Sequence, residues 1–276
     1  MEDRKYPDWR EKTAKEHQLE SVLVGRNEGP VRELLARLVA DPEINLVHSY
    51  ANAVSIRRLG YNDHGPVHAR ITTYNALKIF RLLHEAGVPS SLQAEEIGSY
   101  EDSQVAVALG CFLHDFGMAV TRDEHEWHSI MLADAIIQRY IAEYCSESDR
   151  RIVIRALVHE IIVGHMAHSR IHSIEAGVVL VADGTDLTRG RSRIPLQMEL
   201  KPAVGDMHRF SAGSITRVEI VAGELKPVRI SVFMEDRTGL FQIEEVLMAK
   251  VKASPIIQYL EIAANVNDQE SRFYLR

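Results

Sequence analysis

The first two thirds of the chain repeat apolar residues at helical spacing. Along 31–39 these residues recur three and four positions apart, which predicts a helix with one buried face. Two runs, 105–113 and 174–183, are apolar on every side, which predicts helices buried all round. Further helices are predicted over 45–59, from Pro66 to about Gly87, over 128–144 and over 150–163. Residues 1–20 are polar and are expected to form a loosely held helix or arm.

The hydrophobic period changes to two after Leu200. Alternating residues in 216–222 and 228–235 predict a β-hairpin, and a helix and a further strand are expected over 239–251 and 254–266. The predicted fold class is therefore mainly α, with an all-helical body followed by a small C-terminal α+β module. The predicted domains are residues 1–200 and 201–276, joined by a linker at 200–206.

Composition narrows the function classes. Hydrophobic residues make up 46% of the 276 residues and charged residues 26%, which is ordinary for a globular protein. The formal net charge of -7 argues against generic nucleic-acid binding. Cys111 and Cys145 have no metal or disulfide spacing, no apolar run is long enough for a bilayer, and the first residues form no leader peptide. A cytoplasmic protein without membrane contact is expected.

Histidine is the unusual component, because ten of the 13 histidines lie between His64 and His172. His114 and Asp115 directly follow the apolar run 105–113. Neighbouring residues on a helix point roughly 100° apart, so these two side chains can reach two different atoms of one cluster. Asp183 likewise ends the apolar run that begins at 174. A buried carboxylate must be paired or must coordinate a metal.

The inward-facing polar residues together form a candidate metal site. They are His68, His114, Asp115, His128, His159 and Asp183. Imidazole and carboxylate without thiolate suit iron or manganese, with zinc and nickel as alternatives. Any one of these histidines alone would more often be a hydrogen-bonded core residue. Six ligands with one bridging carboxylate can hold two divalent transition metal ions.

The order H…HD…H…H…D resembles the HD-domain superfamily of metal-dependent phosphohydrolases. HSIMLADAII resembles the family's HPxxGAxIL helix, IRALVHE its I-x-x-H helix and VADGTDLTRGR its closing segment, so the similarity covers roughly 60–195. The resemblance implies an all-α fold with Asp115 bridging the two metals. It also implies hydrolysis of a phosphomonoester or phosphodiester, with nucleotides as the commonest substrates, by a metal-activated hydroxide.

Two departures limit the resemblance. Met118 stands where many members have a phosphate-contacting lysine, and VHEIIVGHMAH lacks the histidine pair and the GYP triplet of the branch that cleaves cyclic di-GMP. His64 is a further candidate ligand, with a capping or surface role as the alternative.

Other residues are candidates for catalysis and substrate binding. Asp115 could orient the attacking water, and His125 or His165 could protonate the leaving oxygen, because an imidazole side chain ordinarily titrates near neutrality. Arg122 and Arg189 are candidate phosphate contacts, although a solvated surface charge is the common alternative for each.

Two rival functions remain open. Some proteins with a similar ligand pattern are di-iron oxygenases, and a metal-retaining signalling or sensor module would keep the same fold. The expected partner is a phosphorylated small molecule, and the C-terminal module is a candidate surface for homo-oligomer contacts.

Overall fold

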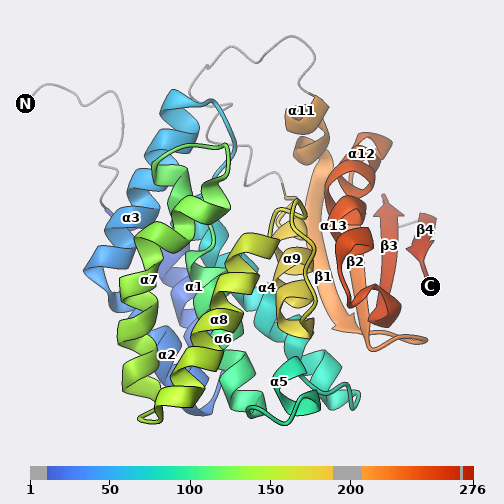
Figure 1. The fold of residues 1–276 in the computed structure, drawn as a ribbon. Coiled ribbons are helices and arrows are strands. Elements are labelled where there is room, and N and C mark those ends of the chain that lie inside the picture. The colour runs from blue at the N-terminus through green and yellow to red at the C-terminus, as the bar shows by residue number, and fades with distance from the viewer. Residues whose placement is uncertain (1–10, 189–206, 268–269) are drawn as a thin grey trace, which may run out of the picture.

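The computed structural model describes residues 11–188, 207–267 and 270–276. Figure 1 shows a helical body on one side and a β-sheet on the other, and this sheet has four strands. The helices of the body are α1 (Ala14–Gly25), α2 (Gly29–Ala40), α3 (Pro42–Ala53), α4 (Pro66–Glu85), α5 (Ser91–Ala94), α6 (Tyr100–Leu113), α7 (His125–Tyr144), α8 (Ser148–Gly164) and α9 (Ile174–Gly184). A π-helical turn follows α3 at Val54–Arg58, and a 3-10 turn follows α6 at Phe116–Ala119.

Helix α6 is the centre of the body. Its N-terminus is fixed by a capping box, in which the Ser99 hydroxyl accepts from the backbone N–H of Asp102 and the Asp102 carboxylate accepts from that of Ser99. Every residue from Val105 to Leu113 is buried, and α4, α8 and α9 pack around the helix. The prediction of a helix buried on all sides is confirmed. Its C-terminus therefore delivers His114 and Asp115 to the interior.

The C-terminal module is a mixed sheet covered by helices. Its elements are α11 (Met207–Ser214), β1 (Ile215–Ala222), β2 (Val228–Met234), α12 (Leu240–Gln242), a π-helical turn (Ile243–Leu247), α13 (Met248–Ala253), β3 (Leu260–Val266) and β4 (Glu270–Leu275). The strand order is β1-β2-β3-β4, with β2 and β3 parallel and the two outer pairs antiparallel. The predicted hairpin is confirmed, with Ile220 opposite Ile230.

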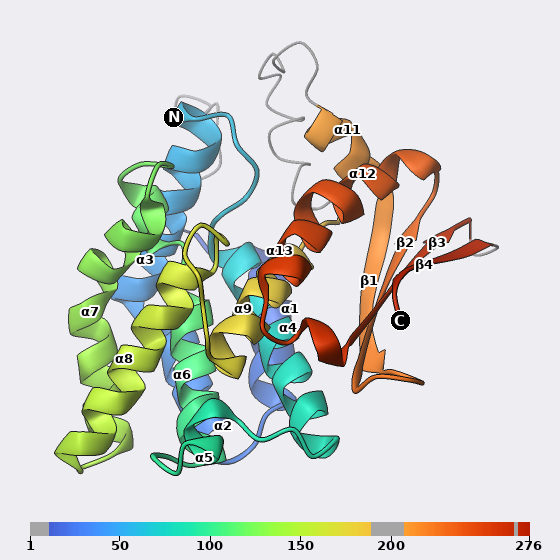
Figure 2. The same cartoon turned by 45° about the vertical axis from the view of Figure 1, so that its right-hand side comes forward.

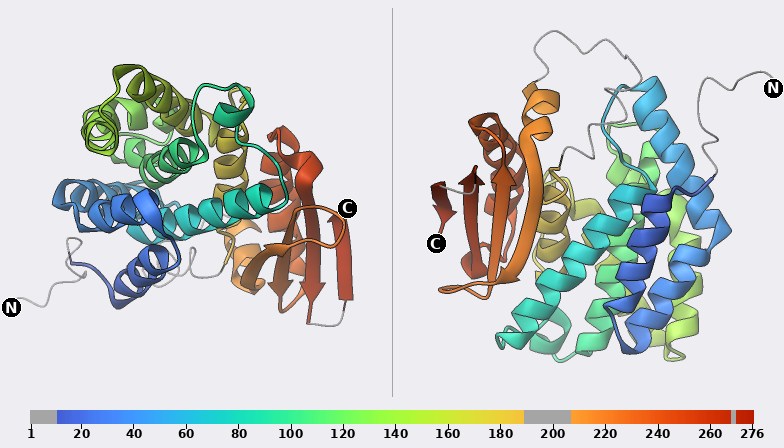
Figure 3. Two further views of the ribbon diagram at one scale, coloured as in Figure 1. Left: turned by 90° about the horizontal axis from the view of Figure 1, so that it is seen from below. Right: turned by 180° about the vertical axis from the view of Figure 1, so that it is seen from behind.

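The module packs directly on the helical body. Helix α13 lies against α9, and α4 contacts β1 and β2. Figure 2 shows α13 facing α9, and both views in Figure 3 keep the sheet beside α4 and α9. This docking matters for function, because α9 ends at the candidate site.

The predicted fold class, a mainly helical body followed by a small α+β module, is confirmed. Several details differ from the sequence-based expectation: the helix expected over 45–59 is α3 followed by a π-helical turn, and the strand expected over 254–266 begins only at Leu260. Helix α7 begins at His125 rather than His128, and β4 was not expected at all. The predicted linker and the domain boundary at 200/201 lie outside the described residues. Within the described ranges, no helix is long and apolar enough to span a membrane.

Candidate metal centre

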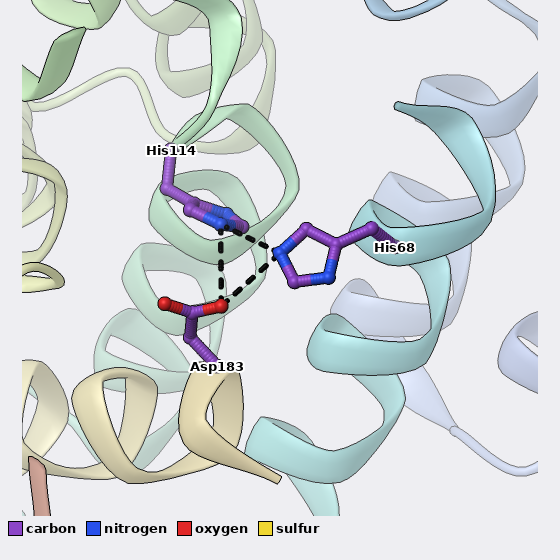
Figure 4. A group of neighbouring side chains, drawn as sticks. All are labelled: His68, His114 and Asp183. Carbon is purple, nitrogen blue, oxygen red and sulfur yellow. Dashed lines mark hydrogen bonds and ion pairs between the residues drawn. The ribbon is translucent and has the colours of Figure 1, made fainter. Parts of the chain in front are cut away.

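Six buried side chains converge where five helices begin or end. His68 is in the first turn of α4, His125 opens α7, His165 directly follows α8 and Asp183 is the last residue but one of α9. His114 and Asp115 follow α6. Figure 4 shows His68, His114 and Asp183 meeting from three separate helices. Helix ends can approach one point more closely than helix middles can. The packing of the five helices therefore brings the six side chains together.

The first group is made by His68, His114 and Asp183. The Nε2 atoms of His68 and His114 are 3.3 Å apart, and His68 Nε2 is 3.1 Å from Asp183 Oδ1. Asp115 Oδ2 lies 3.4 Å from His68 Nε2 and 3.3 Å from His114 Nε2. His68, His114 and Asp183 could hold a metal ion.

The second group surrounds the other oxygen of Asp115. Asp115 Oδ1 is 3.2 Å from His125 Nε2 and 3.6 Å from His165 Nε2. The two imidazole nitrogens are themselves 3.0 Å apart. His114, Asp115 and His165 form a further set that could hold a metal ion. Asp115 therefore lies between the two groups and presents one oxygen to each.

Hydrogen bonds at the outer nitrogen fix all four imidazoles. His68 Nδ1–H donates to Asp186 Oδ2 (2.7 Å), while the Nδ1–H groups of the other three donate to backbone carbonyls. The pairs are His114 with Cys111 O (2.6 Å), His125 with Arg122 O (2.9 Å) and His165 with Ile162 O (2.6 Å). Carbonyl and carboxylate oxygens only accept, so each Nδ1 must carry the proton. Each Nε2 then turns a lone pair toward the centre, as in metal-ligating histidines.

This arrangement suits a bound cation, either a proton or a metal ion. Lone pairs at Nε2 that face each other at 3.0 Å and 3.3 Å repel unless positive charge lies between them. Asp115 Oδ2 is buried and has no hydrogen-bond partner in the described structure, which is costly for a carboxylate oxygen. The nitrogen and oxygen donors fit a divalent transition metal, since thiolates are absent from the cluster and imidazoles outnumber carboxylates.

The pKa shifts keep these groups ready to coordinate. Burial raises the pKa of Asp115. The neighbouring His114, His125 and His165 have a larger, opposite effect, and the pKa lies well below its usual range. Burial also raises the pKa of Asp183, and the Lys250 ammonium and His68 bring it well below its usual range. Burial lowers the pKa of His165 to about 4. Near neutral pH the carboxylates are therefore ionised and His165 is unprotonated.

The turn after His114 is shaped by a close approach of α7. A Cβ atom on Gly117 would lie 1.9 Å from the carbonyl oxygen of His125, so no other residue fits there without moving α7. Ser129 supports the same contact, because its hydroxyl donates to His114 O and accepts from Gly117 N. Gly117 and Ser129 thus hold His125 beside Asp115.

The structure does not bring His128 and His159, both expected as ligands, into the cluster. His159 Nε2 is 2.9 Å from Asp134 Oδ1 and its side chain is 29% exposed, while His128 is half-buried. At a rise of 1.5 Å per residue, His128 lies roughly 4.5 Å along the helix axis from His125. His159 lies roughly 9 Å along its own axis from His165. His125 and His165, expected to act as proton donors, lie in the cluster instead. The sequence does indicate a site position for His165, because this residue follows the apolar segment IIVG just as His114 follows CFL.

The remaining sequence candidates lie at the edge of the cluster or outside the described residues. His64 lines the pocket over the cluster, and its Nδ1 is 2.8 Å from Asn62 O. Arg122 lines the same pocket, with its guanidinium 5.7 Å from the ring centre of Tyr61. Arg189 lies outside the described residues. Asp186 accepts a hydrogen bond from His68 and so orients its ring.

The pocket has a volume of about 300 Å³, and one wall comes from the C-terminal module. Glu245, Val246, Ala249 and Lys250 line this wall. The Lys250 ammonium donates to Asp183 Oδ2 and to His165 O, the latter at 2.7 Å. Sequence reasoning missed this contribution, because nothing local to α13 indicates that it faces a site more than sixty residues earlier in the chain.

Comparison with known proteins gives one relative. No family model and no solved structure matches the chain. A protein of Methanocaldococcus jannaschii, named uncharacterized protein MJ1020, is 39% identical over 246 residues, which cover 89% of this chain and 93% of the relative. At that identity and coverage, the chain belongs to the same protein family as MJ1020.

Proposed function

We propose that the protein is an HD-type phosphohydrolase that uses two divalent metal ions to cleave a phosphoester of a small molecule. The ligand order is then His68, His114-Asp115, His125, His165 and Asp183. This order keeps the H…HD…H…H…D pattern and replaces His128 and His159 of the sequence-based set with His125 and His165. Iron or manganese suits the mixed imidazole and carboxylate donors best.

One observation carries the proposal. The two oxygens of Asp115 face two different groups of imidazoles, Oδ2 toward His68 and His114 and Oδ1 toward His125 and His165. A carboxylate placed in this way suits a bridge between two ions. A core histidine–aspartate pair without chemistry would need one hydrogen bond and would leave no Nε2 lone pairs facing one another.

The two ions, when bound, would polarise a phosphoryl group and activate water near neutral pH. The chain's own residues set the geometry. Asp186 and three backbone carbonyls hold the imidazole rings in one orientation, which preorganises the site. With His125 and His165 in the ligand set, we no longer assign either one the role of proton donor to the leaving oxygen.

The charges of the pocket suit an anionic substrate. Its lining includes three carboxylates, Asp115, Asp183 and Glu245, and two cationic side chains, Arg122 and Lys250. These sum to one negative charge, and two divalent ions would change the sum to three positive charges. The volume of about 300 Å³ is at the lower end of the range for small-molecule sites. A small phosphorylated metabolite, such as a mononucleotide, suits both the charge and the size.

The test is metal content together with a substrate screen on the full chain. Elemental analysis should find two metal ions per chain, and the loaded protein should release phosphate from a phosphomonoester or cleave a phosphodiester. Asp115→Ala should lose both metal and turnover. Asp134→Ala is the matched control, because Asp134 is a carboxylate paired with Arg155 and His159 away from the cluster.

Other outcomes favour the rival functions. Oxygen uptake with an organic substrate and without phosphate release would support the oxygenase. Tight metal binding without turnover of any phosphoester would support a sensor module. An Asp115→Ala variant that keeps its full metal content would refute the ligand assignment itself.

A further inference from the structure

Lys250 links the C-terminal module to both halves of the metal centre. Its ammonium donates to Asp183, which belongs to the first group, and to the backbone carbonyl of His165, which belongs to the second. The side chain is only 13% exposed. A lysine drawn this far into a site must contribute more than surface charge, because its burial costs hydration energy.

The position of Lys250 is built into the packing between α13 and α9. Ser254, directly after α13, donates through its hydroxyl to Gly177 O at 3.0 Å. A Cβ atom on Gly177 would lie 2.8 Å from the Ser254 hydroxyl and 2.9 Å from Pro255 Cγ, so glycine permits this close approach. The same helix α9 carries Asp183, and the Lys250 ammonium is thus held at a fixed place relative to the cluster.

The helix before Lys250 has an irregular turn at the pocket. The segment Ile243–Leu247 is π-helical, and Glu245 and Val246 within it line the pocket. Turns of this kind widen a helix locally and often occur at functional sites. The module therefore presents a shaped wall to the pocket as well as a single charge.

Two cationic side chains from different parts of the chain line the pocket. Arg122 comes from the turn before α7, and within the described part of the chain it forms no ion pair. Lys250 comes from α13, and its two contacts leave one of its three N–H donors for a ligand. A lysine and an arginine that line one pocket beside a metal centre are suited to hold the oxygens of one anionic group.

We propose that Lys250 is a substrate-binding residue that, together with Arg122, holds the phosphoryl group of the substrate, so that the α+β module completes the active site. This inference rests on the proposed phosphohydrolase function. It assigns the module a direct role in binding, in place of a separate role as a sensor. The alternative is that Lys250 only neutralises Asp183 and has no contact with substrate.

The experiment measures binding of inorganic orthophosphate by calorimetry to the full chain loaded with Mn²⁺, with metal content measured in parallel. Lys250→Met should weaken phosphate binding about tenfold or more, a loss of about 1.4 kcal/mol for each factor of ten. Its metal content should equal that of the wild type. Lys250→Arg should restore part of the affinity, because it keeps the charge. Lys252→Met is the matched control, since Lys252 is exposed on the same helix, and its phosphate affinity should stay within about twofold.

Two results would overturn the proposal. Phosphate affinity in Lys250→Met within twofold of the wild type would show that Lys250 does not bind the anion. Loss of metal from Lys250→Met would show that Lys250 supports Asp183 instead. The hydrolase is judged separately by wild-type turnover. A protein that binds metal and phosphate through Lys250 but cleaves no ester would refute the hydrolase and keep this role of Lys250.

Discussion

The Nε2 atoms of His125 and His165 lie 3.0 Å apart, although the two residues are 40 positions apart in the chain. Each is held by a hydrogen bond from its own Nδ1 to a backbone carbonyl three residues earlier, Arg122 O and Ile162 O. The same local contact thus fixes both rings at the ends of two different helices. Asp115 Oδ1 completes this side of the cluster, at 3.2 Å and 3.6 Å from the two nitrogens.

The ligand assignment makes a paired prediction for four histidines. His125→Ala and His165→Ala should each lower metal content from two ions to about one per chain, because each removes a ligand from one side of Asp115. His128→Ala and His159→Ala should keep the wild-type content, since both side chains lie away from the cluster. Elemental analysis of the four purified variants checks this. Metal loss from His128→Ala or His159→Ala, with full content in His125→Ala, would reverse the assignment.

Asp186 should tune metal affinity without touching the metal. Its carboxylate accepts the Nδ1–H of His68 at 2.7 Å and so fixes the orientation of that ring. Loss of such an outer partner typically lowers metal affinity about 10- to 100-fold. Asp186→Asn should therefore weaken retention of one metal ion in a competition with a chelator, while the second ion remains. Equal retention by Asp186→Asn and the wild type would contradict this role.

Gly117→Ala should destabilise the protein by more than a surface substitution does. The added Cβ would lie 1.9 Å from the carbonyl oxygen of His125, and backbone cannot move aside as a flexible side chain can. A loss of about 2 kcal/mol or more is expected, in the range of overpacked core substitutions. Gly25→Ala is the control, because nothing lies within 4 Å of its added Cβ. Urea unfolding of the metal-free proteins measures both, and equal stabilities would show that α7 can shift freely.

His48 should make the fold sensitive to acid. It is buried, its Nε2–H donates to Phe112 O at 2.8 Å, and burial lowers its pKa to about 3. The unfolded chain, with an ordinary pKa near 6.5, binds more protons between about pH 6.5 and 3, so stability falls as the pH falls through this window. At one pH unit below 6.5, His48 lowers the free energy of unfolding by about 1.4 kcal/mol.

The test compares His48→Gln with the wild type at pH 7.5 and pH 5.5, with chelator present so that metal release does not contribute. Glutamine can donate to Phe112 O but does not titrate. The wild type should therefore lose about 1.4 kcal/mol more unfolding free energy between the two pH values than the variant loses. Equal losses would show that His48 is not the group responsible.

Much of the body was predictable because its signals are local. The all-round apolar run that ends at Leu113 and the alternating residues of 228–234 identify a buried helix and a strand without knowledge of the partners. His68, His114, Asp115 and Asp183, which lie together in the structure, were proposed in the same way, since each is a polar residue at one end of an apolar segment. His128 was expected in place of His125 because helix boundaries are weak signals, and α7 begins three residues before the expected start.

The sequence by itself determined the helical body, the α+β tail and a chemistry based on imidazole and carboxylate, because periodicity and residue type act over a few neighbouring positions. Only the tertiary structure decided that His125 and His165 rather than His128 and His159 join Asp115, since that choice depends on where two helices end in space. It also decided that Lys250 reaches Asp183 across 67 positions. Contacts of this range depend on how α13 packs against α9, which no local pattern encodes.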